Sequence, residues 1–272
     1  MTRNARGTLR RDLYWAIGPL LLVLLVVGSY CALSQHEPGR FELSQSWRGP
    51  SLSRPLGSGE GGIDLLSFVA HATWQVLLLG GFVASLAFVV GTLLGSLAGV
   101  IKGTFSSALL RVCDLVQSFP SFLLALAVLS AVDTPRRWHL ALVFSISAWA
   151  PFARIALVQA RALSVAQFVE AARAAGASRW QVTLHHIVPN LLGPVSIQIG
   201  TAAAGVVLGE TGLSFVGLGP ADGVSLGSLL EQGTLGMVRA PHVLAVGAAA
   251  IVIVSGSLQL ASEGLRRSTD IR

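Results

Sequence analysis

The stretch EAARAAGASRWQVTLHHIVPN, residues 170–190, separates two long apolar runs at residues 140–160 and 191–210 with polar and small side chains. A helix over residues 165–175 would place Glu170 and Arg173 on its more polar faces. The same helix would gather four apolar side chains near one another, those of Phe168, Ala171, Ala172 and Ala175. The spacing therefore predicts a short amphipathic helix between the two runs.

A turn and a second short helix are predicted to follow. Gly176 permits the turn because glycine pays no Cβ penalty there. Ser178 can cap a helix that runs to about His186. Pro189 is expected to end that helix and to begin the next long one, since proline is tolerated in a first helical turn. Residues 161–189 are thus predicted to form a helix–turn–helix.

The composition places this segment in a membrane protein. The 272 residues are 53% hydrophobic and 12% charged, with a mean hydropathy of +0.69, whereas a soluble domain is about 25% charged. Long continuous apolar runs favour spanning helices over a barrel, because only these two structures satisfy the backbone within lipid. We expect an all-α integral membrane protein with six transmembrane helices, at residues 13–33, 74–101, 108–131, 140–160, 191–210 and 243–261.

The positions of the basic residues predict the orientation. With both termini inside, thirteen of the 19 basic residues lie on the cytoplasmic side, as the positive-inside rule requires. Residues 1–12 are then a cytoplasmic N-terminus, 13–33 an uncleaved first helix and 34–70 an extracytoplasmic loop. Residues 71–262 form the transmembrane core, which includes the segment 161–189, and residues 263–272 form a cytoplasmic tail. Cys31 and Cys113 fall on opposite sides and should not form a disulfide.

Glycine recurs every fourth residue in the stretch GTLLGSLAGVIKG, at Gly91, Gly95, Gly99 and Gly103. In a helix this spacing lines one face with glycine, which lets a second helix approach closely. We expect this face to be a packing surface inside the bundle.

Two acids and one proline in the apolar runs need an explanation. Asp114 follows Arg111 by three residues, and the spacing favours a structural ion pair between them over a role in transport. Glu210 is a functional candidate because an acid at membrane depth is costly, although it could equally reach water. Pro120 should kink the helix over 108–131. Pro120 and Glu210 are therefore candidates to line a translocation pathway, with a purely structural kink left open for Pro120.

Several stretches together resemble one family. Glu170-Ala171-Ala172, then Gly176, then the run from His186 to Pro189, is similar to the EAA loop of ATP-binding-cassette importer permeases. The closest similarity is to the C-type subunit of the dipeptide, oligopeptide and nickel group. The stretches RPLGSGEGGID, RVCDLVQSFPSFLLAL, GETGLSFVGLG and SEGLRRSTDIR resemble that group's other segments in the same order, over residues 50–272.

The resemblance implies a fold and a set of partners. The fold would be that of a type I importer permease, in the bacterial cell membrane. The residues that couple to the ATPase would be Glu170, Ala171, Ala172, Gly176, His186 and Pro189. The chain would pair with a homologous permease and work with two cytoplasmic ATPase domains and an extracytoplasmic substrate-binding protein. It would need no metal or other cofactor itself, with ATP and Mg²⁺ bound by the ATPases.

The residues also limit the alternatives. The only lysine, Lys102, is followed by glycine and not by serine or threonine, so the chain lacks a phosphate-binding loop and is not expected to be an enzyme. The basic surface suits anionic lipid or an ATPase groove and not nucleic acid. Peptides are the expected substrate, with nickel or another small solute as the alternative. An ion-driven secondary transporter and an intramembrane hydrolase using Ser225 are the competing classes.

Overall fold

The computed structural model describes residues 3–33, 41–101 and 103–270. Their regular elements are helices, and the only β feature among them is an isolated bridge between Ser58 and Asp64. The long helices are α1 (Arg3–Leu33), α2 (Leu65–Ile101), α5 (Arg137–Leu163), α8 (Val188–Phe215) and α10 (Pro241–Asp270). The shorter elements are η1 (Leu43–Gln45), η2 (Glu60–Gly62), α3 (Gly103–Ser118), α4 (Ser121–Leu129), α6 (Gln167–Ala174), α7 (Arg179–Gln181), η3 (Val182–Ile187) and α9 (Leu226–Leu235).

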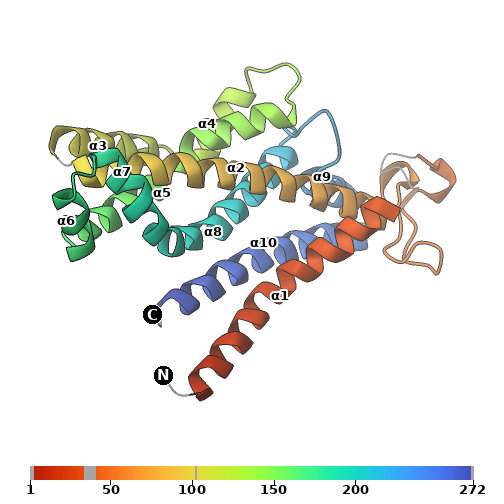
Figure 1. Cartoon of the computed structure of the whole chain (residues 1–272). Helices are drawn as coiled ribbons and strands as arrows, with labels where there is room; N and C mark the ends of the chain where they lie inside the picture. Colours follow the sequence, from red (N-terminus) through yellow and green to blue (C-terminus); the bar gives the residue numbers. More distant parts are fainter. Residues whose placement is uncertain (1–2, 34–40, 102, 271–272) are drawn as a thin grey trace.

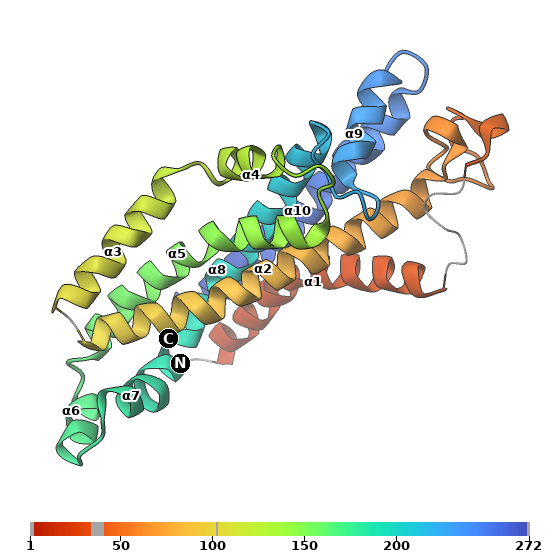
Figure 2. The same ribbon diagram turned by 90° about the horizontal axis from the view of Figure 1, so that it is seen from above.

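Among the described residues, five helices are long and apolar enough to cross a membrane, and α3 and α4 together make a sixth, broken crossing. The distortion predicted at Pro120 in the helix over 108–131 is a full break, because α3 and α4 are separate helices that meet at an angle of 69°. The break falls at Pro120, whose ring removes a backbone donor and disfavours helical geometry at the preceding residue. Figure 2 shows α3 and α4 as separate segments beside α5.

Most spanning helices extend beyond the predicted bounds. α2 begins at Leu65 and not at residue 74, and α8 reaches Phe215 and not residue 210. α10 continues to Asp270, so much of the predicted tail 263–272 is helical, and α1 begins at Arg3, within the predicted terminal segment 1–12. Apolarity marks only the part of a helix that lies in lipid, whereas backbone hydrogen bonding carries the helix on into water. Residues 1–2, 34–40, 102 and 271–272 of the predicted segments lie outside the described part of the chain.

α2 and α5 pack along the glycine face of α2. A Cβ added at Gly91 would lie 2.6 Å from the Trp149 carbonyl oxygen, and one at Gly99 would lie 2.9 Å from the Leu157 carbonyl oxygen. The backbones of the two helices therefore touch at positions where any side chain would separate them. Gly103 departs from the prediction, because it adopts a φ of +65° in the turn to α3 and no atom comes within 4 Å of its Cβ position.

α1 and α10 run side by side, and both chain termini lie at one end of the molecule (Figures 1 and 2). That end, which also carries α6 and α7, is called the terminal end below. α9 and residues 41–64 lie at the opposite end. There Arg54 forms an ion pair with Glu42 and donates a hydrogen bond to the Gly62 carbonyl oxygen at 2.8 Å. Contacts among its own residues therefore hold the segment 41–64, which precedes α2, in a defined fold.

Candidate functional site

The polar segment between α5 and α8 folds as a short helix anchored by one side chain. Val169, in the middle of α6, is fully buried and belongs to a cluster with Val182 and Ile187 of η3 and Ala160 of α5. Ala172, one turn later, packs against the same cluster. α6 spans Gln167–Ala174, slightly shorter than the predicted 165–175. One apolar core thus joins the end of α5, the start of α8 and the segment between them.

The turn after α6 has the geometry that its sequence predicts. Gly176 has a φ of +89°, which an L side chain rarely adopts. Ser178 then begins α7 with a capping box, in which its hydroxyl accepts a hydrogen bond from the Gln181 backbone N–H at 3.3 Å. In return the Gln181 side-chain oxygen accepts from the Ser178 backbone N–H at 2.8 Å. These paired bonds fix the direction in which the chain leaves the turn.

The prediction that Pro189 ends the second helix is wrong. α7 passes through the π-helical segment η3 directly into α8, so that Arg179–Phe215 is one continuous helical run. Pro189 stands in the first turn of α8, where its missing N–H is tolerated. His186 is half-buried within η3, and its carbonyl oxygen accepts a hydrogen bond from the Asn190 side chain at 2.7 Å. The segment is therefore joined to α8 without a flexible break.

The opposite face of this segment is exposed. Glu170, Ala171 and Gly176 all face solvent. Two large apolar side chains beside them, Phe168 and Trp180, are 43% and 52% exposed. Exposed apolar surface next to small residues is typical of an interaction site. Of the six predicted coupling residues, the structure leaves Glu170, Ala171, Gly176 and Pro189 exposed and Ala172 and His186 partly covered.

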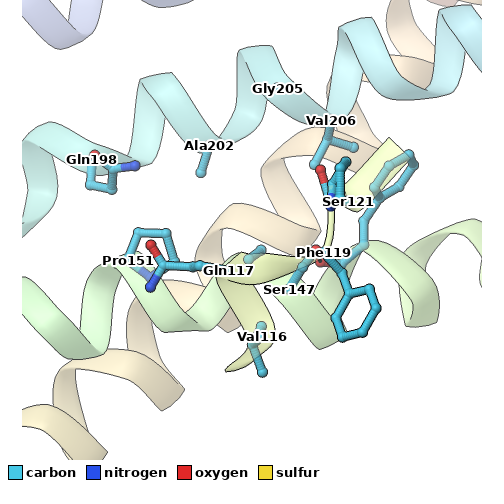
Figure 3. Close-up of a pocket in the computed structure, with 13 residues that line it drawn as sticks. Val116, Gln117, Phe119, Ser121, Ser147, Pro151, Gln198, Ala202, Gly205 and Val206 are labelled. Carbon is cyan, nitrogen blue, oxygen red and sulfur yellow. Dashed lines mark hydrogen bonds between the residues drawn. The ribbon is translucent and has the colours of Figure 1, made fainter. Parts of the chain in front are cut away.

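A cavity of about 360 Å³ lies where α3 and α4 meet, facing α5 and α8. Pro120 lines it, and so do two amide side chains, Gln117 and Gln198, and two hydroxyls, Ser121 and Ser147. Figure 3 shows Gln198 and Ala202 on α8 above Pro151 and Gln117. None of the described residues that line the cavity is charged. The wall can therefore offer hydrogen bonds to a polar solute without fixing a charge.

Glu210, the second candidate for the pathway, lies elsewhere. It is 3% exposed, near the end of α8 that carries α9, and does not line this cavity. Its carboxylate accepts a hydrogen bond from the Ser214 hydroxyl at 2.9 Å. The nearby Ser225 is buried and caps α9, its hydroxyl accepting from the Gly227 backbone N–H at 3.0 Å. The possibility that Glu210 simply reaches water is thus wrong, since the carboxylate is enclosed where α8 meets α9.

Asp114 also differs from expectation. Its carboxylate pairs with Arg154 of α5 and not with Arg111, the pair that the spacing favoured. α3 packs along α5, and this places Arg154 beside Asp114. Cys31 and Cys113 are free thiols.

Gln117 and Gln198 were missed by the sequence reasoning. Each lies inside a run of apolar residues, and an isolated amide at membrane depth is a signal of the same kind as the acid at Glu210. Their convergence could not be foreseen, because it depends on the break between α3 and α4 and on how α8 packs against α5.

The fold and these features define a multi-pass, all-α membrane protein with a surface segment between two of its crossings. The chain belongs to the family of binding-protein-dependent transport system inner membrane components, whose model matches residues 91–265. It is thus a permease subunit of an ATP-binding-cassette importer, and the resemblance noted in its motifs is confirmed.

Named relatives come from peptide, dipeptide and glutathione transport systems. A permease protein assigned to a peptide transport system of Brucella suis is 31% identical over 99% of this chain and 91% of its own length. A permease protein of an Escherichia coli D,D-dipeptide transport system is 29% identical over 92% of this chain and 84% of its own length. The permease protein GsiD of a glutathione transport system of Pectobacterium atrosepticum is 27% identical over 97% of this chain and 89% of its own length.

Proposed function

We propose that this chain forms half of a translocation pathway for di- or oligopeptides, and that partner ATPases drive it through the segment 161–189. This proposal rests on the exposed face of α6 and α7, which the buried Val169 side chain holds against the bundle. A docking surface has to be accessible, yet it must also be joined firmly to the helices that it moves. Val169 and the continuous run from α7 into α8 provide that connection.

ATP binding would close two ATPases against each other, and the docked segments would follow them. In this scheme both chain termini and α6 lie in the cytoplasm, as the basic residues predict. The motion would tilt α8 and α5 as rigid bodies and so alternate access to the pathway. ATP and Mg²⁺ belong to the ATPases, and this chain contributes no catalytic residue.

Peptides suit the uncharged cavity at the break between α3 and α4. A peptide backbone offers amide donors and carbonyl acceptors, which Gln117, Gln198 and the two serines can match. The names of the relatives point to the same substrate class. Nickel or another small solute is the alternative, which transport assays with a labelled dipeptide and with nickel would separate. A homologous permease would supply the facing half, and an extracytoplasmic binding protein would deliver the substrate.

The test of coupling is co-purification from the native host in mild detergent. The tagged wild-type chain should bring down a second permease and an ATPase. Gly176→Asp should keep the permease and lose most of the ATPase. Gly103→Asp is the matched control, because Gly103 is also a turn glycine with positive φ and open space around its Cβ position. Ala171→Arg adds a bulky charge to the exposed face without backbone strain and should act like Gly176→Asp.

Two results would reject the proposal. One is equal ATPase recovery with Ala171→Arg and with the wild type. The other is a chain that purifies alone and transports after reconstitution into vesicles, which would favour an ion-driven transporter. The hydrolase alternative predicts that Ser225→Ala abolishes activity. We expect unchanged chemistry and only a loosened start of α9, because the Ser225 hydroxyl caps that helix.

A further inference from the structure

A second cavity, separate from the one at the break between α3 and α4, lies among α1, α2, α8 and α10. Its volume is about 330 Å³, and its walls are almost entirely apolar. Leu20 and Leu24 of α1 line one side, Ala203 of α8 lines another, and Leu265 of α10 lies toward the terminal end. This apolar groove plays no part in the coupling segment or in the amide-lined cavity.

The groove exists because small residues stand where large ones would fill it. Gly81 of α2 lines it and is exposed, and no atom lies within 4 Å of its Cβ position. Gly200 lies where α8 crosses α10, and a Cβ added there would lie 2.6 Å from the Leu258 carbonyl oxygen. The helices therefore touch at Gly200 and leave an opening at Gly81. An opening of this kind within a membrane span is reachable from lipid.

The end of the groove near Leu265 carries basic residues. Arg266 and Arg267 follow Leu265 directly, and both form ion pairs with Glu263. α1 and α10 cross where Ala16 meets Gly264, so the arginine-rich start of α1 lies beyond that crossing at the same end. Residues 3–12 carry a net charge of +3, and residues 263–267 carry +1. An apolar groove that leads to a positively charged rim matches the two parts of an anionic phospholipid.

We propose that this groove binds one anionic phospholipid, with an acyl chain between α1 and α8 and the headgroup at the basic rim. A helix from a partner subunit fits less well. Only a phospholipid joins an acyl chain to an anionic headgroup, as the apolar groove and its basic rim require. An acyl chain is narrower and can enter through the gap at Gly81. The proposal needs only the membrane placement of the chain and does not depend on its substrate or its ATPase.

The experiment uses the full chain in nanodiscs that hold phosphatidylglycerol and phosphatidylcholine in equal amounts, one of the two carrying a diazirine on its acyl chain. After irradiation, peptide mapping should find the phosphatidylglycerol label on the groove residues of α1, α2, α8 and α10. Gly81→Leu should remove at least nine-tenths of that label by filling the groove. Gly256→Leu is the matched control, since Gly256 also has no atom within 4 Å of its Cβ position but does not line the groove.

A headgroup variant tests the choice of lipid. Arg267→Gln should lower the preference for phosphatidylglycerol over phosphatidylcholine about fivefold, the effect of one arginine near an anionic headgroup. An even spread of the label over the lipid-facing helices of the wild-type chain would overturn the proposal. This measurement uses only the wild type, so it does not depend on the folding of any variant. Equal labelling of Gly81→Leu and wild type would overturn it as well. So would cross-linking of a Leu24→Cys chain to a partner permease in place of lipid labelling.

Discussion

Gly95 provides the sharpest test of how the bundle is packed. It is buried on α2, and a Cβ added there would collide with the Ala153 carbonyl oxygen of α5 and lie 2.9 Å from the Ala153 Cα. Carbon atoms prefer about 3.5–4.0 Å, so Gly95→Ala must push the two helices apart by roughly 0.6–1.1 Å. The obstacle is backbone and cannot rotate away. Overpacking of this kind costs about 1–3 kcal/mol.

Gly81→Ala on the same helix makes this cost measurable. The Cβ position of Gly81 is open, so the gain in helix propensity, about 1 kcal/mol, is the same for both variants and cancels in their difference. The free energies of unfolding of Gly95→Ala and Gly81→Ala should therefore differ by about 2 kcal/mol, which corresponds to roughly a thirtyfold difference in the unfolding equilibrium. Unfolding in mixed micelles, titrated with sodium dodecyl sulfate and followed by fluorescence of the six tryptophans, would report it. Equal midpoints for the two variants would refute the close approach of α2 and α5.

Three further predictions concern single side chains. Ser178→Ala should cost about 0.5–2 kcal/mol at the start of α7, seen as faster amide exchange in its first turn; unchanged exchange would contradict the capping geometry. Val169→Ala should destabilise the anchoring of α6 by about 2 kcal/mol and lower ATPase recovery, whereas Phe168→Ala on the exposed face should leave stability unchanged. Glu210→Ala should cost about 1–3 kcal/mol, since it leaves the Ser214 hydroxyl without its acceptor, while Glu210→Gln keeps an acceptor. Equal thermal midpoints for Glu210→Ala and Glu210→Gln would argue against this role of the hydrogen bond.

The apolar runs predicted the crossings well because lipid imposes one condition on every spanning residue. Their ends were predicted poorly. α2 begins nine residues before residue 74, because a helix keeps its hydrogen bonds after it leaves the lipid. Pro120 indicated a distortion, but the size of the 69° bend depends on how α4 packs against α5 and α8.

The candidate site likewise contains features that neighbouring residues predict and features that only the packing of the helices decides. The turn at Gly176 and the cap at Ser178 follow from local backbone chemistry, and both could be predicted from a few neighbouring residues. The partner of Asp114 could not, because Arg154 is forty residues away and reaches it only through the contact between α3 and α5. Pro189 misled the prediction for a related reason. A proline in a first turn is compatible both with a new helix and with the continuation of an old one, and η3 provides the continuation.

The continuous run from α7 through η3 into α8 has a mechanical consequence. From Val188 at its start to Gln198 at the cavity wall, α8 rises roughly 15 Å, at about 1.5 Å per residue. A rotation of α8 by about 20° around its start would carry the Gln198 amide sideways by roughly 5 Å, which is close to one helical turn. α8 therefore acts as a lever arm, through which a rotation at the membrane surface becomes a displacement of the cavity wall.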